Sequence, residues 1–418
     1  MTEVLKPLDV ITDDKSQNPD YVFFHSGSTP TYRKVTTSPS QITTIPTIDI
    51  TNIDSPSPSI RAALAQELYS ACISCGFFYL KGHGMSEDLL TETFDVLKRF
   101  FALDLESKMD AHVQKNPAIR GYEPMGETKL DPRTKQDFKE SYTIGDCPLE
   151  PEQNYTSKTG KAPPPNLKRP QNLWPNSAPW FRDGLYRYYN EVLPISLKLV
   201  RLLALSLGLD EEEFIGDFFK FPITGMRALH YPPVPAEDEG SDEMNIGLGA
   251  HADFSCKTSS PTKSIINHNQ KDEGFLLDAH AYTDLTLVLQ TPSLSSSSAL
   301  EVLTPTGQWI SVPSIPNTLV CNVGQYLERQ TNGRFLAAVH RVRNRTGEER
   351  YSLPFFLTMD QDANVDVLVE KGEEKKFEGF NVGDLYIRKV LPARRKHPTS
   401  VKYRDVPESE WKYDFLLK

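Results

Sequence analysis

Apolar residues recur at three- and four-residue spacing along three stretches of the first half of the chain, and this period predicts helices with one buried face. The predicted helices are 59–74, 87–101 and 180–207, and Pro194 inside the last of them predicts a kink. Short β-rich runs at Ile45–Ile50 and Gly76–Leu80 flank the first helix and predict two strands.

The second half of the chain has a different pattern. Short β-rich segments alternate there with Pro, Gly and Asn turns, which is typical of a β-sandwich or jelly roll. Because the helices come first and the strands later, we expect an N-terminal helical layer that braces this core. The predicted strands are 226–231, 285–290, 300–303, 309–312, 318–323 and 351–357.

A length of 418 residues allows two or three domains, or one large β-barrel domain with helical additions. Residues 1–44 are rich in Ser, Thr, Pro and Asp, and we expect an extended or loosely attached arm. We then expect a mixed helical region over 45–215, the jelly-roll core over 216–391 and a C-terminal tail over 392–418.

Composition and charge narrow the class of partner. Hydrophobic residues make up 38% of the chain and charged residues 24%, a balance that supports a globular core. A net charge of -10 disfavours binding to nucleic acid or anionic lipid, and no apolar stretch is long enough to cross a membrane. The expectation is a cytoplasmic monomer that acts on a small molecule and contacts neither nucleic acid nor membrane.

The five cysteines form an odd and scattered set, which is typical of reduced thiols in an intracellular protein. Cys72 and Cys75 make one C-x-x-C pair, but they lie in an apolar helix pattern without a second pair. We therefore interpret them as structural, with a metal or redox role as the minor alternative. The first 20 residues lack a basic start followed by an apolar run, so no secretory signal is expected.

His251 and Asp253 are the sharpest candidates for chemistry. On a strand, residues i and i+2 point to the same face, so the imidazole and the carboxylate can converge on one metal ion. An H-x-D pair is also common at surfaces and turns, and a second histidine is needed. His340 follows an apolar run and supplies the best third ligand. Two imidazoles and one carboxylate leave three octahedral positions open, which suits iron(II) better than zinc.

Arg350 and Ser352 lie ten and twelve positions beyond His340 and share one strand face. A guanidinium with a hydroxyl beside it can hold the far carboxylate of a dicarboxylic acid near the metal. The alternative is an exposed arginine that follows the polar segment Gly347–Glu349.

Together these residues resemble a known family, the iron(II)- and 2-oxoglutarate-dependent oxygenases, in the branch that also contains isopenicillin N synthase and the plant flavonoid and gibberellin oxygenases. The likeness covers residues 45 to about 391 and suggests a fungal type of member. The pieces that carry it are Ile45–Asp49, Gly76–Phe78, Gly82–Gly84, Tyr231–Pro233, His251-x-Asp253, Thr331–Gly333, His340–Val342 and Arg350-x-Ser352.

The resemblance implies a mixed α+β fold with a double-stranded β-helix (jelly-roll) core. It implies that His251, Asp253 and His340 bind iron(II), with 2-oxoglutarate and dioxygen as cosubstrates and ascorbate as a reductant. Arg350, Ser352 and Tyr231 would hold 2-oxoglutarate. The reaction would be hydroxylation or desaturation of a small organic molecule, in specialised metabolism.

The chain departs from the family pattern near this site. Leu229 stands where relatives often have Asn, and Gln325 where many have Asp. Two further histidines have simpler explanations, because His83 fits a turn between glycines and His230 points to the strand face opposite Tyr231. Residues 138–142 are candidates for lining the substrate entrance.

Residues 255–284 form an atypical polar insertion between the H-x-D motif and the next apolar strand. One hypothesis is a lid over the site. The favoured hypothesis is a retained intron, because codons for Cys256-Lys257 can contain a GTAAG donor and codons for Thr283-Asp284 an ACAG acceptor. Splicing would merge Cys256 and Asp284 into one tyrosine and shorten the separation of His251 and His340 from 89 to 61 positions.

Two other functions stay open. One is an oxidase on the same scaffold that takes all its electrons from the substrate, as isopenicillin N synthase does. The other is a non-catalytic jelly-roll binding protein, if the insertion distorts the site.

Overall fold

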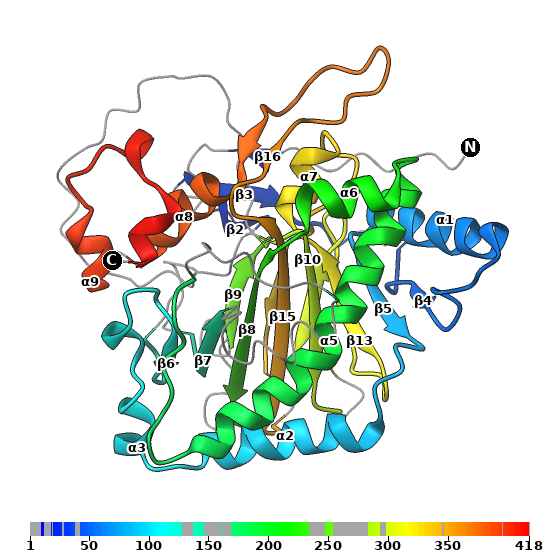
Figure 1. Cartoon of the computed structure of the whole chain (residues 1–418). Helices are drawn as coiled ribbons and strands as arrows, with labels where there is room; N and C mark the ends of the chain where they lie inside the picture. Colours follow the sequence, from blue (N-terminus) through cyan, green and yellow to red (C-terminus); the bar gives the residue numbers. More distant parts are fainter. Residues whose placement is uncertain are drawn as a thin grey trace.

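The computed structural model describes residues 10–11, 18, 20–26, 29–37, 42–127, 137–145, 160, 169–233, 247–253, 283–292, 298–344, 347–394 and 396–417. Its centre is a pair of β-sheets, with helices covering one outer face (Figure 1). Side chains of both sheets meet in one buried apolar cluster, as in the predicted double-stranded β-helix.

The larger sheet has eight strands, and its edges are formed by strands from the N-terminal half of the chain. The order is β4 (Thr47–Asp49), β5 (Phe77–Lys81), β13 (Leu319–Val323), β10 (Leu285–Gln290), β15 (Arg350–Asp360), β8 (Pro222–Tyr231), β7 (Glu140–Gly145) and β6 (Gly121–Glu123).

The smaller sheet has seven strands and carries His251, the first residue of the H-x-D motif. The order is β1 (Val10–Ile11), β3 (Thr29–Lys34), β2 (Tyr21–Ser26), β9 (Leu248–His251), β14 (His340–Val342), β11 (Leu300–Leu303) and β12 (Trp309–Ser311). A separate pair, β16 (Asn364–Val365) and β17 (Phe380–Asn381), lies outside both sheets.

The three predicted helices form as α1 (Pro58–Ser74), α2 (Glu87–Phe101) and α5 (Pro179–Ser206), and the described residues contain further short helices that were not predicted. These are α3 (Leu105–Met109), α6 (Glu211–Phe218), α7 (Gln325–Gln330), α8 (Val382–Ala393) and α9 (Pro398–Lys402). Short 3₁₀ segments are Val113–Lys115, Glu408–Glu410 and Tyr413–Leu417. α2 has the predicted bounds, since Ser86 caps its first turn by accepting a hydrogen bond from the Leu89 N–H at 3.2 Å.

Strand alternation divides β10 between two environments. Leu285, Leu287 and Leu289 belong to the apolar core that the helices α1, α2 and α5 share with the larger sheet. Thr286 and Gln290 occupy the opposite face, toward the smaller sheet. Burial of each leucine stabilises this layer by about 1.5–3 kcal/mol. The same alternation therefore anchors the sheet to the helices and places polar side chains inside the jelly roll.

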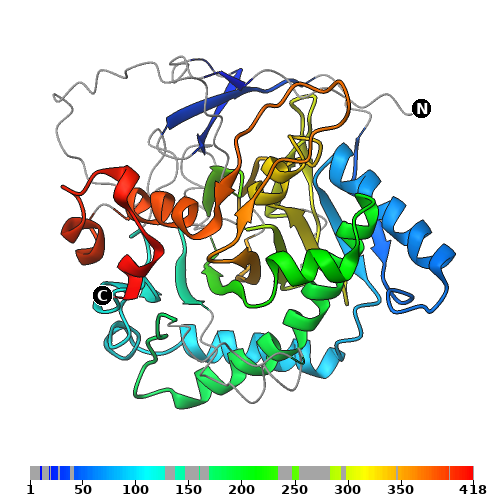
Figure 2. The same ribbon diagram turned by 45° about the horizontal axis from the view of Figure 1, so that its top comes forward.

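The described parts of the predicted N-terminal arm and C-terminal tail pack on the core. The described part of the predicted N-terminal arm is extended, and β2 and β3 form a hairpin that joins the smaller sheet through a parallel pairing of β2 with β9. Figure 2 shows this hairpin on the side of the molecule opposite α2 and α5. The predicted start of the C-terminal tail, residue 392, falls inside α8, and Tyr403 and Leu416 beyond it are buried.

Residues 254–282, which include most of the predicted insertion, lie outside the described residues. None of the helices in the described part of the chain combines the length and the apolar character that crossing a bilayer requires.

Asp284, at the end of the insertion, is fully buried next to β10. Its Oδ2 accepts a hydrogen bond from the Met359 N–H at 2.7 Å, and its Oδ1 has no hydrogen-bond partner among the described residues. Burial raises the pKa of this carboxyl to about 8. The core therefore favours the protonated acid over the carboxylate.

Asp284→Asn is expected to stabilise the chain increasingly as pH rises. Burial raises the folded-state pKa of Asp284, so the protonated acid contributes its full stability below about pH 4. This contribution is lost as the pH rises through about 8, because the unfolded chain releases the proton more readily than the folded one. The variant should exceed the wild type by roughly 2–5 kcal/mol in the free energy of unfolding at pH 8.5, and by less at pH 5. Urea unfolding at both pH values checks this; equal pH slopes for the two proteins would contradict the buried-acid assignment.

Candidate functional site

His251 and His340 lie directly opposite each other on neighbouring antiparallel strands. His251 ends β9, His340 begins β14, and the two residues are register partners. Directly paired residues project to the same sheet face, so the two imidazoles are adjacent, with ring centroids 4.1 Å apart. Asp253 follows two positions after His251. The separation of 89 positions along the chain is thus closed by one strand pairing.

The three side chains converge on one point. Asp253 Oδ1 lies 4.0 Å from His251 Nε2 and 3.7 Å from His340 Nε2, and one ligand atom of each residue lies within 4.8 Å of the others. All three residues are buried. Ligand atoms about 2.1 Å from a common ion are about 3 Å apart on an octahedral edge, so a small inward movement of each side chain would complete a metal site.

Backbone carbonyls fix which nitrogen each histidine presents. His251 Nδ1 donates to the Gly249 carbonyl at 2.9 Å, and His340 Nδ1 donates to the Ala338 carbonyl at 3.1 Å. The remaining Nε2 lone pairs face Asp253, which is the tautomer that binds a metal ion. Burial, followed by the neighbouring His340, lowers the pKa of His251 well below its usual value. His251 is therefore held neutral, as a ligand must be.

Asp253 is oriented by two residues that the sequence analysis missed. Thr286 Oγ1 donates to Asp253 Oδ2 at 2.7 Å, and Asn322 Nδ2 donates to the same oxygen. These bonds occupy Oδ2 and leave Oδ1 facing the histidines. The sequence held a signal, because Thr286 and Asn322 are polar residues inside apolar strands, and buried polar residues need partners. The donor set, its tautomers and this anchoring together fit an octahedral divalent metal such as iron(II).

Arg350 is buried inside the jelly roll, so its interpretation as an exposed residue is wrong. It begins β15, and its register partner is Tyr231, the last residue of β8. The guanidinium carbon lies 4.9 Å from the Tyr231 ring centroid. Arg350 Nη1 donates to Ser352 Oγ at 3.5 Å. The structure thus brings together the three residues predicted to hold 2-oxoglutarate.

Gln290 is a further residue of this group that the sequence analysis missed. It is the register partner of Ser352, and its Oε1 accepts a hydrogen bond from Arg350 Nη2 at 3.0 Å. Burial raises the pKa of Tyr231, so its hydroxyl keeps its proton at neutral pH and can donate to an anion. Leu229, where relatives often have Asn, pairs with Ser352 from the other side.

The remaining sequence candidates lie away from this site or serve the fold. His83 is buried in a turn, where its Nδ1 accepts the Met85 N–H at 3.2 Å, as expected for a structural histidine. Cys72 and Cys75 are buried free thiols, and burial raises the pKa of Cys75 to about 11, which disfavours the thiolate. Both are absent from the metal-ligand cluster found among the described residues.

His230 and Glu140 form a polar group on the helix side of the larger sheet. His230 Nδ1 lies 2.7 Å from Glu140 Oε1, and Lys108 donates to the same carboxylate at 2.8 Å. The Tyr142 side chain also packs in the helix-side core. The prediction that residues 138–142 line the substrate entrance is therefore wrong for Glu140 and Tyr142, since strand alternation turns both away from the jelly-roll interior.

Two family models match the chain. Residues 45–177 match the N-terminal region of a non-haem dioxygenase in morphine synthesis, and residues 222–359 match the 2OG-Fe(II) oxygenase superfamily. The second range begins and ends on β8 and β15 and so contains every residue of the site described above.

Curated relatives align over most of their own length. The chain is 30% identical over 347 residues to the 2-oxoglutarate-Fe(II) type oxidoreductase hxnY of Emericella nidulans, covering 81% of this chain and 87% of that protein. It is also 30% identical to a homoarginine-6-hydroxylase of Glycine max, covering 84% and 98% of the two chains.

Solved structures share the fold. A full-length Neurospora crassa protein, crystallised in complex with alpha-KG and thymine, superposes with a TM-score of 0.65 at 23% identity, covering 85% of this chain and 98% of that one. A putative 2OG-Fe(II) oxygenase family protein of Caulobacter crescentus gives 0.63 at 25% identity, covering 84% and 99%. The chain therefore belongs to the 2-oxoglutarate and iron(II) oxygenase superfamily, and it is an oxidoreductase that depends on iron(II) and 2-oxoglutarate.

Proposed function

We propose that His251, Asp253 and His340 hold the iron(II) and that Arg350, Ser352 and Tyr231 bind the distal carboxylate of 2-oxoglutarate. One observation carries this proposal. The Nε2 atoms of the two histidines and Asp253 Oδ1 face one another, while the Nδ1 atoms and Asp253 Oδ2 are held by hydrogen bonds. The bound metal, with 2-oxoglutarate and dioxygen, supplies the oxidising power for attack on an unactivated carbon.

The protein's own residues bind and orient. Thr286 and Asn322 hold the Asp253 carboxylate, and the Gly249 and Ala338 carbonyls hold the two imidazoles, so the ligand atoms are positioned before a metal arrives. Arg350 is kept in place by Gln290 and Ser352 and offers its charge to an incoming carboxylate. Burial of the whole group excludes water and strengthens each of these electrostatic contacts.

The substrate is a small organic molecule, which is hydroxylated or desaturated in specialised metabolism by a cytoplasmic monomer. Relatives by name act on homoarginine, and solved neighbours bind thymine or JA, so the scaffold accepts chemically different small molecules. Ascorbate would serve as the reductant. The buried thiols Cys72, Cys75 and Cys321 support a reducing compartment.

The alternatives have less support. A non-catalytic binding protein has no need of three anchored metal ligands around one point. The buried Arg350 beside Ser352 counts only modestly against an oxidase that does without 2-oxoglutarate, because an R-x-S pair also occurs in that branch. The relatives named as 2-oxoglutarate-Fe(II) oxidoreductases count against it more strongly.

His251→Ala is expected to abolish succinate formation. The change removes one of the three proposed metal ligands, so the rate should fall by more than about 100-fold. Loss of a residue that only hydrogen-bonds to a ligand costs less than this. Succinate release and iron content after anaerobic reconstitution provide the measurement. His112→Ala is the control, because His112 pairs with Glu127 away from the site and its loss should leave both values unchanged. A normal rate in the His251 variant would remove that residue from the ligand set.

Arg350→Gln is expected to raise the KM for 2-oxoglutarate by about 10- to 100-fold while iron content stays normal. The variant loses a charge-assisted hydrogen-bonded pair worth about 1.5–3 kcal/mol. Oxygen consumption and succinate release at varied 2-oxoglutarate concentrations provide the measurement. Oxygen consumption that is equal with and without 2-oxoglutarate in the wild type would instead establish the oxidase alternative.

We also propose that residues 257–283 derive from a retained intron. The spliced product replaces Asp284 with tyrosine and so removes the buried carboxylate whose pKa is raised to about 8.

A chain that lacks 257–283 and carries tyrosine in place of Cys256 and Asp284 is expected to melt at a higher temperature and to keep iron binding. Transcript sequencing should find the spliced message. Detection in the native protein of the tryptic peptide from Ser264 to Lys271 would contradict the proposal.

A further inference from the structure

His230 lies at the end of the larger sheet where the Arg350 group is found, but on the other face of that sheet. It is the register partner of Glu140 on β7 and of Tyr351 on β15, so it stands in the middle of three neighbouring strands. One position along these strands, Tyr231 and Arg350 are register partners on the inner face. The residues around His230 therefore lie directly behind the proposed 2-oxoglutarate site.

Both ring nitrogens of His230 face a carboxylate. Nδ1 lies 2.7 Å from Glu140 Oε1, and Nε2 lies 2.9 Å from Glu349 Oε1. The ring is also stacked on Tyr351, with centroids 4.8 Å apart and planes 10° apart, and the Phe101 ring packs against it at 5.3 Å. Because the imidazole is buried, these neighbours decide which hydrogen bonds it makes.

Glu140 fixes one proton of the ring on Nδ1. The other oxygen of Glu140, Oε2, accepts hydrogen bonds from Lys108 Nζ at 2.8 Å and from the Tyr122 hydroxyl. Although burial acts to raise it, the hydrogen bond from His230 and those from these two groups hold the pKa of Glu140 below its usual value. An ionised carboxylate accepts hydrogen bonds and cannot donate one, so Nδ1 carries an N–H that points to Glu140.

The contact between His230 and Glu349 depends on a second proton. With Nδ1 protonated, a neutral imidazole presents a lone pair at Nε2, and this lone pair would face a carboxylate oxygen of Glu349. The contact is a hydrogen bond only when Nε2 also carries a proton, which makes the ring an imidazolium. Because histidine is the side chain that changes charge in the physiological pH range, this link between β8 and the start of β15 is sensitive to pH.

The neighbouring elements place charged and titratable groups around His230 and Glu140. Burial, and then the charge of Glu349, raise the pKa of Tyr351, so its phenol keeps its proton. Lys108 is already bound to Glu140, so His230 is the group that can offer Glu349 a positive charge. The described groups are Lys108 of α3, Tyr122 of β6, Glu140 of β7, Tyr351 of β15 and Glu349 just before it, while α2 contributes the uncharged Phe101.

Glu349 borders the end of the proposed 2-oxoglutarate site. It immediately precedes Arg350, and both residues line, with Gln290, a cavity of about 20 Å³, which is enough space for about one water molecule. Arg350 begins β15 and Tyr231 ends β8, so both stand at strand ends, where pairing is most easily lost. A hydrogen bond from His230 to Glu349 ties these two strand ends together from the helix side.

We propose that His230 is a positioning residue for 2-oxoglutarate, and that its imidazolium form holds Glu349 and thereby keeps Arg350 in place for the cosubstrate. The inference rests on the proposed 2-oxoglutarate site and adds a residue on the opposite sheet face that controls it. When the Nε2 proton leaves, the bond to Glu349 is lost and the strand end that carries Arg350 is held less firmly. Binding of 2-oxoglutarate therefore weakens as the pH rises.

Two substitutions of Glu349 test the dependence on a proton. In Glu349→Gln the side-chain amide can accept from a protonated Nε2 or donate to an unprotonated one, so the contact persists at every pH. In Glu349→Ala the contact is absent at every pH. Glu349 is exposed, so neither variant disturbs the core, and both remove the same charge. A difference between the two variants therefore reports on the contact with His230.

The Kd of 2-oxoglutarate for the Mn(II)-saturated full-length chain is measured by calorimetry at about pH 6 and about pH 8.5, on either side of the usual titration range of histidine. Relative to Glu349→Gln, the wild type should lose about three- to tenfold in affinity between the two pH values, because one hydrogen bond is lost. Glu349→Ala should bind more weakly than Glu349→Gln by a similar factor at both. A ratio of wild type to Glu349→Gln that does not change with pH, or equal Kd values for the two variants, would overturn the proposal.

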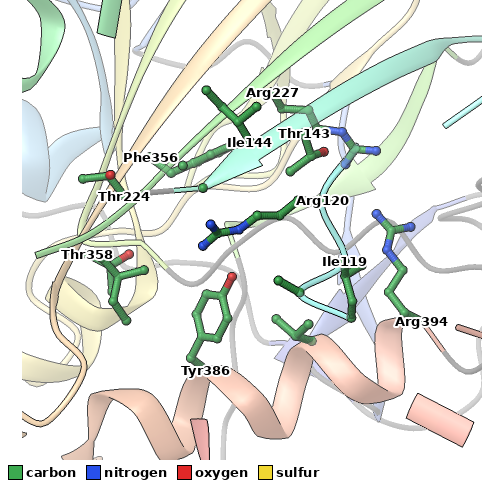
Figure 3. A pocket seen from close by; sticks show the side chains of 15 residues that line it. Ile119, Arg120, Thr143, Ile144, Thr224, Arg227, Phe356, Thr358, Tyr386 and Arg394 are labelled. Atoms are coloured by element: carbon green, nitrogen blue, oxygen red, sulfur yellow. The ribbon is translucent and has the colours of Figure 1, made fainter. Parts of the chain in front are cut away.

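Glu127→Gln is the matched control. Glu127 pairs with the Nε2 of another histidine, His112, at 3.1 Å and away from the site, so this variant should follow the wild type at both pH values. Loss of the pH response in this control as well would contradict the assignment to Glu349. The Glu349 variants also leave untouched the cavity that Figure 3 shows between β7, β8, β15 and α8, because it lies at the other end of these strands.

His230→Phe tests the histidine itself. The variant keeps a ring to stack on Tyr351 and leaves Glu140 with Lys108 and Tyr122 as partners. It should bind 2-oxoglutarate more weakly than the wild type at about pH 6 and should lack the pH response, while the rate of succinate release at saturating 2-oxoglutarate stays the same. Wild-type affinity at the lower pH would contradict the role of His230. If His230→Phe does not fold, the Glu349 variants decide the question.

Hydrogen exchange of the metal-free chain separates this inference from the proposed function. At about pH 8.5 residues 349–353 should exchange faster in the wild type than in Glu349→Gln, and at about pH 6 the two rates should be equal, whether or not 2-oxoglutarate binds. Failure of the wild type to bind 2-oxoglutarate would refute the proposed function. Equal exchange at the higher pH would refute the role of His230 alone.

Discussion

The site depends on the antiparallel register of β9 and β14. That register places His251 directly opposite His340, and a shift by one residue would turn one imidazole to the other side of the sheet. On its other side β9 pairs in parallel with β2, which gives the smaller sheet a further strand beside the two histidines. Ala250 of β9 and Val339, just before β14, belong to a separate buried apolar cluster. The geometry of the proposed metal centre is therefore a consequence of strand pairing, which brings the two histidines together.

Sequence patterns predicted the elements whose residues carry their own signal. The helix 87–101 has a capping serine, acidic residues in its first turn and a clear apolar stripe, and its bounds were predicted to the residue. Strand 285–290 was equally clear, because three buried leucines alternate with other residues. The three metal-site candidates followed from the i, i+2 rule and one further histidine on a predicted strand, and the structure brings them together.

The sequence could not show which strands are neighbours in each sheet. Thr286 and Gln290 become functional candidates only when β10 is placed between β13 and β15, because their partners Asp253 and Arg350 lie far from them in the sequence. Likewise, β2 and β3 were predicted only as part of an extended arm, since a hairpin that completes an existing sheet draws its stability from the strand it joins. Glu140 was misjudged for the same reason, because its direction depends on the phase of the pairing of β7 with β8.

Arginines stand at two places along the inner side of the larger sheet. Arg350 lies at one end and donates to Gln290 and Ser352, whereas Arg227 and Arg394 lie toward the other end and pair with Glu123. The presence of an arginine alone therefore does not single out a place for 2-oxoglutarate. We favour the end with Arg350, because a guanidinium lies there beside a hydroxyl and the Tyr231 ring. At the other end the Glu123 carboxylate already pairs with both guanidinium groups, and a second carboxylate beside it would meet like charge.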